Sequence, residues 1–270
     1  MRHDPGNRLL AMTLLLSLAA CQREVPAPQV QPQAQAPPPE PAVALKDVSE
    51  THPNYVVGIS YPPAANKYPG LAAALQRYAD AARAELKQAV DGLGTDKPPA
   101  PYDLSLSFTQ LAETPRMVAI AADGSSYTGG AHGNPLIARF VWLPQEKKML
   151  SAAELVPDPK AWAAISDYAR EQLHTSLSQR IDGEDMEPAD RAELLKNAGK
   201  MIDEGTGAEA ANFAQFEPVL AGDGRLQALR FVFPPYQVGP YSDGTQTVEV
   251  PAEVLLPSVA PAYRSLFVGG

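Results

Sequence analysis

Strand-like and helix-like segments follow one another in blocks along this chain, and that order limits the folds it can adopt. Apolar patterns typical of strands occupy residues 54–61, 104–109, 117–122, 136–142, 213–220, 226–233 and 245–250. Apolar residues at helical spacing occupy residues 69–92, 158–180 and 188–202. Because the strands come in adjacent runs with helices inserted between them, the pattern favours an α+β fold over regular βαβ winding. We predict an antiparallel sheet with helices packed on it.

These segments all lie between residues 46 and 270. We expect this region to form a single compact body of two intimately joined parts, residues 46–156 and 157–270. The chain is 45% hydrophobic, which suffices for a core of that size. The tetrapeptide Ala221-Gly222-Asp223-Gly224 separates two strand-like runs and predicts a hairpin turn.

The first 20 residues have the features of a lipoprotein signal peptide. Arg2 and Arg8 form a short basic region before an apolar segment, Leu9–Ala20. This segment has about 12 residues, whereas a membrane-spanning helix needs roughly 20. The segment ends in Leu18-Ala19-Ala20-Cys21, which resembles the lipobox of bacterial lipoproteins, where the cysteine is lipidated and becomes the new N-terminus. The alternative is an ordinary cleaved signal peptide beside an incidental cysteine.

The residues after Cys21 indicate where the protein is anchored. Aspartate directly after the cysteine commonly signals retention in the inner membrane, but this chain has Gln22. The resemblance therefore implies an outer-membrane lipoprotein that faces the periplasm and is held to the membrane by lipid on Cys21. Residues 21–45 are rich in Pro, Gln and Ala, a composition typical of a disordered tether.

Composition and missing motifs exclude several kinds of function. The formal net charge is -9, so we expect no nucleic-acid partner. Cys21 is the single cysteine, which excludes an intramolecular disulfide and thiol catalysis. Gly-x-Ser-x-Gly, His-Glu-x-x-His and P-loop motifs are missing from the sequence. We expect no cofactor and no metal, and the sequence does not define an oligomeric state.

The strongest candidate for a functional site is a glycine-rich loop between two strand-like runs. It contains Tyr127, Gly129, Gly130 and His132. Glycine permits positive φ angles and close approach of a ligand to the backbone, and histidine serves as a general base or a ligand contact. In the alternative interpretation, the His132 ring only braces the loop through a hydrogen bond.

A second stretch, residues 233–244, has similar chemistry and contains Tyr236 and Tyr241. Tyrosines beside glycines stack on sugar rings or anchor protein interfaces, and the alternative is that they pack as lids over the loops. Asp123 and Asp243 each precede a glycine, which is first of all turn chemistry. Either carboxylate would be an acidic partner for His132 in an enzyme.

At these two loops the sequence resembles the RsiV/PdaC-type family of extracytoplasmic domains, described as a domain of unknown function. The matching segments are Tyr127-Thr128-Gly129-Gly130-Ala131-His132-Gly133 and the stretch from Phe233 to Gly244, followed by Val248-Glu249-Val250-Pro251. The resemblance implies an α+β fold whose two parts share one body. Family members occur in a lysozyme-sensing anti-sigma factor and beside a peptidoglycan deacetylase domain. Only eight residues precede the apolar segment and no deacetylase domain follows, so we expect neither transcriptional regulation nor deacetylation.

These observations lead to one main hypothesis and two alternatives. We expect a non-enzymatic, lipid-anchored binding module of the cell envelope that recognises a protein such as lysozyme or a peptidoglycan-type glycan. Its expected ligand contacts are Tyr127, Gly129, Gly130, His132, Tyr236 and Tyr241. The first alternative is a small envelope hydrolase that uses His132 with an acidic partner. The second is a scaffold for another envelope protein.

Overall fold

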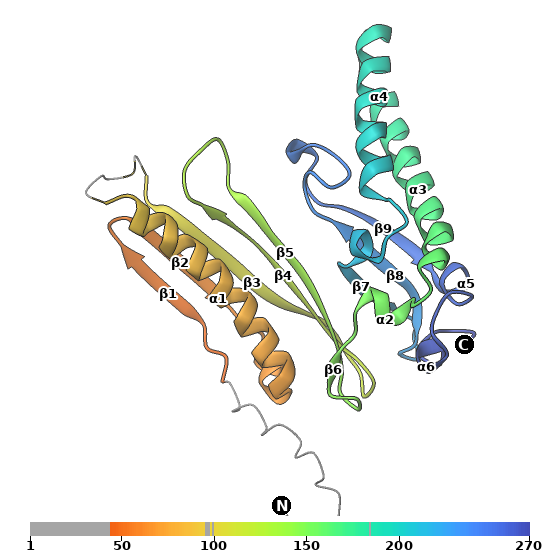
Figure 1. Cartoon of the computed structure of the whole chain (residues 1–270), viewed down its shortest axis with the longest axis horizontal. Coiled ribbons are helices and arrows are strands. Elements are labelled where there is room, and N and C mark those ends of the chain that lie inside the picture. The colour runs from red at the N-terminus through yellow and green to blue at the C-terminus, as the bar shows by residue number, and fades with distance from the viewer. Residues whose placement is uncertain (1–43, 95–97, 99, 184) are drawn as a thin grey trace, which may run out of the picture. The chain divides into compact units, whose positions relative to one another are not determined.

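The computed structural model describes residues 44–94, 98, 100–183 and 185–270 (Figure 1). The predicted signal peptide, Cys21 and the tether as far as residue 43 lie outside the described residues. Leu45, the last residue of the predicted tether, is 8% exposed, and its backbone N–H donates to Asn66 Oδ1 at 2.8 Å. Across the described ranges, none of the helices is both long and apolar enough to cross a membrane.

The first part of the chain forms a six-stranded sheet whose strands lie in sequence order. The strands are β1 (Val48–His52), β2 (Tyr55–Ser60), β3 (Tyr102–Glu113), β4 (Val118–Tyr127), β5 (Asn134–Leu143) and β6 (Lys148–Met149). Neighbouring strands are antiparallel except β2 and β3, which are parallel. Four of the five strand pairs are thus antiparallel, as expected, and the pairing of β2 with β3 makes the sheet mixed.

The connection between β2 and β3 explains their parallel pairing. The chain leaves β2 through the 3-10 helix η1 (Pro63–Lys67) and then the long helix α1 (Pro69–Gly92). A helix of this length carries the chain back to the end of the sheet where β2 began, so β3 runs in the same direction. Helix α1 begins at Pro69 and ends at Gly92, as the sequence predicts. Strand β1 was not predicted, because its sequence, Val-Ser-Glu-Thr-His, is mostly polar.

The second part forms a separate three-stranded antiparallel sheet. Its strands are β7 (Phe216–Leu220), β8 (Leu226–Phe233) and β9 (Gln246–Pro251), and its long helices are α3 (Trp162–Asp182) and α4 (Pro188–Gly205). The short helices are α2 (Ala152–Leu155), η2 (Pro159–Ala161), η3 (Ala210–Phe213), η4 (Tyr241–Asp243), α5 (Ala252–Leu255) and α6 (Pro261–Arg264). The α+β class is confirmed, although the strands form two sheets where one was expected.

Strand β4 is buried on both faces and separates two hydrophobic cores. Val118 and Ile120 belong to the core under α1, together with Leu71 and Leu75 of that helix. Ala119, which points to the opposite face, belongs to the core of the second part. A strand with both faces covered needs a continuous apolar run, and Val118-Ala119-Ile120-Ala121-Ala122 supplies it.

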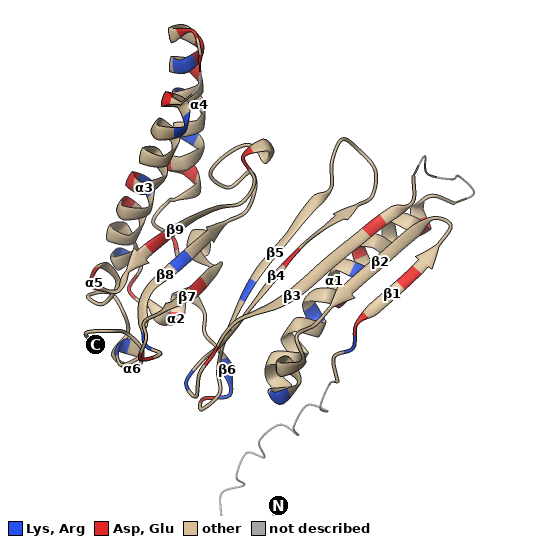
Figure 2. Cartoon of the chain, turned by 180° about the vertical axis from the view of Figure 1, so that it is seen from behind, with Lys and Arg blue, Asp and Glu red and all other residues tan. Residues whose placement is uncertain are grey.

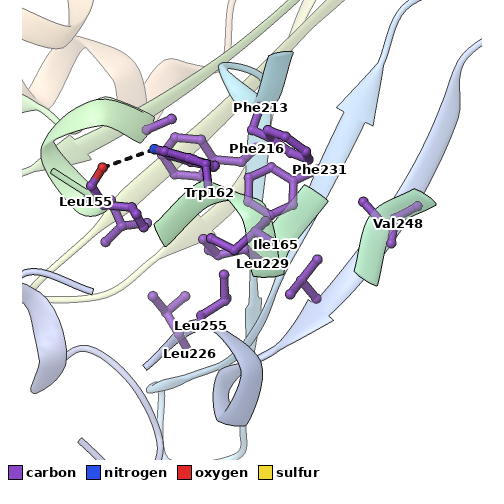
Figure 3. Close-up of a cluster of buried hydrophobic side chains, with 14 of the residues drawn as sticks. Leu155, Trp162, Ile165, Phe213, Phe216, Leu226, Leu229, Phe231, Val248 and Leu255 are labelled. Atoms are coloured by element: carbon purple, nitrogen blue, oxygen red, sulfur yellow. Dashed lines mark hydrogen bonds between the residues drawn. The ribbon is translucent and has the colours of Figure 1, made fainter. Parts of the chain in front are cut away.

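Aromatic side chains fill the second core (Figure 3). The Trp162 ring stacks on Phe213 with 5.3 Å between ring centroids, and Phe231 meets Phe213 edge-on at 5.1 Å. The buried indole N–H of Trp162 donates to the carbonyl oxygen of Val156 at 3.1 Å, so burial leaves no unpaired donor on this ring. These contacts fix α3 against the sheet that carries one of the two candidate loops.

Asp123-Gly124 is not a turn. Both residues lie inside β4, with Gly124 opposite Leu106 of β3. A Cβ atom on Gly124 would lie 2.0 Å from the carbonyl oxygen of Ser105, so only glycine permits the close approach of the two strands. The hairpin between β4 and β5 is therefore longer, and its loop shorter, than the sequence pattern suggests.

We expect Gly124→Ala to lower the free energy of unfolding by about 1–3 kcal/mol, because the added methyl group must push β3 and β4 apart. Urea denaturation followed by circular dichroism measures the change. Gly58→Ala in β2 is the matched control, since a Cβ atom there has nothing within 4 Å. An equal loss in both variants would show that strand propensity, not the contact with Ser105, is responsible.

A buried ion pair joins the two sheets. Arg139 of β5 is paired with Glu217 of β7 at 2.5 Å between Nε and Oε1, and their side chains are only 7% and 11% exposed. Arg139 also donates to Asp123 Oδ1 at 2.9 Å, and Arg230 reaches Glu217 Oε2 at 3.4 Å. Hydrogen bonding to Glu249 raises the pKa of Arg230. The network thus runs from β4 across β5 and β7 to β9.

We expect Glu217→Gln to reduce the free energy of unfolding by about 2–4 kcal/mol, because it leaves a buried guanidinium without its main counter-charge. The control is Glu249→Gln, which removes a carboxylate that is 50% exposed from the same network. That loss should stay below about 1 kcal/mol. Thermal and urea unfolding of both variants would refute the assigned role if the two losses were equal.

Candidate functional site

His132, Tyr236 and Tyr241 meet at one place, which we call the aromatic cluster. The His132 ring stacks on Tyr241 with 3.9 Å between centroids and 15° between ring planes. The Tyr236 hydroxyl lies 2.9 Å from His132 Nε2, and the two tyrosine rings are 5.7 Å apart. His132 comes from the β4–β5 connection and both tyrosines from the β8–β9 connection (Figure 1). The cluster therefore combines the two loops that the sequence singles out.

Glycines and Tyr127 give the first loop its shape. Gly129 and Gly130 have φ angles of +100° and +101°, which only glycine adopts readily. The Tyr127 hydroxyl donates to the carbonyl oxygen of Gly130 at 3.2 Å. Tyr127, at the end of β4, closes the loop and is not part of the aromatic cluster. The structure thus brings together three of the six residues expected to contact a ligand.

The second loop displays Tyr236 in a strained conformation. Tyr236 has a φ angle of +75°, which is uncommon for a residue with a side chain, and the residue is 54% exposed. Its backbone N–H donates to the carbonyl oxygen of Gly239 at 2.9 Å, which closes the turn. Strain of this kind persists only where the surroundings hold the backbone in place.

Two anchors hold the second loop. The Gln237 side-chain amide donates to the carbonyl oxygens of Gly205 and Asn212, at 3.0 and 2.8 Å. A Cβ atom on Gly205 would lie 1.9 Å from the Gln237 carbonyl oxygen, so the loop lies directly against the end of α4. Arg180 of α3 donates to Asp243 Oδ2 at 2.8 Å. Neither Gln237 nor Arg180 was predicted, because no motif marks either side chain.

Both ring nitrogens of His132 have partners. Nδ1 lies 3.1 Å from the carbonyl oxygen of Gly133. A carbonyl oxygen only accepts, so Nδ1 carries the hydrogen, and in the neutral ring Nε2 accepts from the Tyr236 hydroxyl. The hydrogen bond from Tyr236 thus uses the nitrogen that would serve as a general base.

The two acidic partners considered for an enzyme are paired with arginines. Asp123 accepts from Arg139, and Asp243 accepts from Arg180. Within the part of the chain that the structure describes, neither carboxylate forms a hydrogen bond with His132. No group of three or more His, Cys, Asp or Glu side chains is arranged to hold a metal ion among the same residues. The geometry presents ring faces and a hydroxyl rather than a charged dyad.

Two family models match this chain, and each contains one of the candidate loops. A model described as deacetylase PdaC matches residues 48–135, and a model described as a protein of unknown function, DUF3298, matches residues 155–253. His132 lies in the first match and both tyrosines of the cluster lie in the second. No curated protein is similar to the chain.

A solved structure of the second family is similar to this chain in fold. A DUF3298 family member from Bacteroides fragilis has a TM-score of 0.50 at 15% identity, with 81% of this chain and 93% of that chain covered. A DUF3298 family protein from Pseudomonas aeruginosa PAO1 has a TM-score of 0.45 at 18% identity, with 83% and 96% covered. The fold defines an α+β protein of two sheets. The two matches follow one another along the chain and together support a PdaC/DUF3298-type domain of unknown function.

We expect the His132–Tyr241 stack to couple the two loops energetically. A double-mutant cycle of His132→Ala and Tyr241→Ala, measured by urea denaturation, should give a coupling energy of about 0.5–1.5 kcal/mol. Tyr127→Phe serves as a comparison, because it removes only a hydrogen bond inside the first loop. A coupling energy near zero would mean that the two rings lie together without holding the loops.

Proposed function

We propose that this protein is a lipid-anchored binding module of the cell envelope, held at the outer membrane and facing the periplasm. Its ligand is a protein such as lysozyme or a peptidoglycan-type glycan, and the aromatic cluster is its contact surface. The proposal rests mainly on Tyr236, which is displayed to solvent in a conformation that costs energy. Glycine would adopt this φ angle with less strain, so folding stability alone does not favour tyrosine at this position.

The chemistry of the cluster suits binding better than catalysis. Exposed tyrosines supply large contact areas at low conformational cost, and they pack equally well against sugar rings and protein side chains. Anchoring by Gln237 and Arg180 fixes the loop before a ligand arrives, which lowers the entropy cost of binding. Among the described residues no carboxylate forms a hydrogen bond with His132, so hydrolysis is the less favoured alternative and is one outcome of the test.

The test measures retention of the full chain by purified peptidoglycan sacculi and by immobilised lysozyme. We expect binding to one of these, and Tyr236→Ala should weaken it about tenfold, because central aromatic anchors typically contribute more than 1 kcal/mol. Leu111→Ala, at an apolar position of β3 that is 40% exposed, is the control and should bind normally.

Three outcomes separate the hypotheses. Retention by neither material, or unchanged binding of Tyr236→Ala, would contradict the proposed contact surface. Release of soluble sugar fragments by the native chain, lost in His132→Ala, would favour the hydrolase. Binding without release of fragments supports the module.

The anchor is tested separately. We expect Cys21→Ser to move the protein from the membrane fraction to the soluble periplasmic fraction, because Cys21 is the predicted lipidation site. Fractionation followed by immunoblotting measures the shift, and mass spectrometry of the native N-terminus identifies the lipid. Unchanged partitioning together with an unmodified N-terminus would show that the protein is not a lipoprotein.

A further inference from the structure

A groove lies between α1 and the β1–β2 hairpin, in the first part of the chain and away from the aromatic cluster. Its larger cavity has a volume of about 360 Å³, within the range of small-molecule sites. Its charged lining residues are Glu50, Asp80, Arg83, Lys87 and Asp91. An adjoining cavity of about 160 Å³ is also lined by Asp80 and Arg83.

The groove follows from how α1 sits on the sheet. The helix buries Leu75, Ala79 and Leu86 in the core shared with β2, β3 and β4. Between the edge strand β1 and the helix, Arg83 Nη2 reaches Glu50 Oε1 at 2.5 Å, while Val48 of β1 packs against the core under the helix. No large side chain fills the space beside this bridge, so Val57 and Leu86 form an apolar floor below a charged rim.

The charges around the rim do not balance. Arg83 is paired with Glu50, and Lys87 with Asp91 at 2.5 Å. Asp80 has no hydrogen-bond or ion-pair partner among the residues that the structure describes. The cavity therefore has three acidic and two basic lining residues, a net charge of -1. Figure 2 shows an acidic position on β1 and charges of both signs along α1.

Asp80 also acts on the neighbouring tyrosine. Burial raises the pKa of Tyr61, and the negative charge of Asp80 raises it further. Tyr61 is half-buried and lines the adjoining cavity together with Asp80. A positive group placed there would gain attraction from Asp80 without displacing either of the two existing ion pairs.

We propose that this groove binds a small organic cation with an apolar body. The ammonium group lies at Asp80, and the body lies on Tyr55, Val57, Leu86 and Val90. The Tyr55 ring, already stacked on His52 with 4.9 Å between centroids, offers an aromatic wall for a planar body. An anionic ligand would instead have to break the ion pair of Arg83 or Lys87.

Three probes with the same indole body test the charge preference: tryptamine, tryptophol and indole-3-acetate. They are titrated by calorimetry into the full chain carrying Cys21→Ser, so that no lipid is present. We expect tryptamine to bind about three- to fivefold more tightly than neutral tryptophol, because a solvent-exposed ion pair contributes only about 1 kcal/mol or less. The anionic probe, indole-3-acetate, should bind weakest.

Variants locate the binding. Asp80→Asn should abolish the preference for tryptamine over tryptophol, whereas Asp167→Asn, on α3 in the second part, should leave it intact. Ala84→Phe fills the cavity from an exposed helical position and should weaken all three probes. Equal affinity for the three probes in the native chain, or unchanged tryptamine binding in Ala84→Phe, would overturn the proposal. Tighter binding of indole-3-acetate would overturn it too.

Discussion

The buried ion pair between Arg139 and Glu217 is the polar contact on which the joining of the two sheets depends. It lies where β5 meets β7, beside the apolar contacts that β4 makes on both of its faces. Apolar packing alone would tolerate sliding of one sheet over the other, whereas a buried, charge-assisted hydrogen bond requires one alignment. The ion pair therefore helps to fix the alignment of the part that carries His132 with the part that carries Tyr236, together with the hydrogen bond from the Arg139 backbone N–H to Gln215 Oε1.

The contacts within the aromatic cluster depend on that alignment. Each loop is shaped within its own part, the first by Gly129 and Gly130 and the second by the hydrogen bonds of Gln237. Their rings meet only because the two sheets are held together. The 2.9 Å hydrogen bond from Tyr236 and the 3.9 Å stack with Tyr241 join His132 to residues more than 100 positions away. These contacts form only if the two sheets are fixed relative to each other. The cluster is thus a property of the whole described body and not of either loop.

Local patterns predicted much of this molecule. Pro69 and Gly92 marked the ends of α1, Pro188 began α4, and the turn at Ala221–Gly224 placed β7 beside β8. Long-range partners were beyond local patterns. Nothing near Arg139 or Gln237 shows what they bind, and Gly124 resembles a turn glycine unless the proximity of Ser105 is known. The two loops were predicted as a pair from their resemblance to a family, while their contact through three rings emerged only in the structure.

Because the aromatic cluster spans both parts, the binding proposed there would be linked to the stability of the entire fold. A ligand that touches His132 and Tyr236 together binds only when the sheets are docked, so it shifts the equilibrium away from every state in which they separate. At 100 times its dissociation constant, such a ligand would add about 2.7 kcal/mol to that docking. A bound ligand would then hold the two parts together, and the protein would be most resistant to unfolding and proteolysis while the ligand is bound.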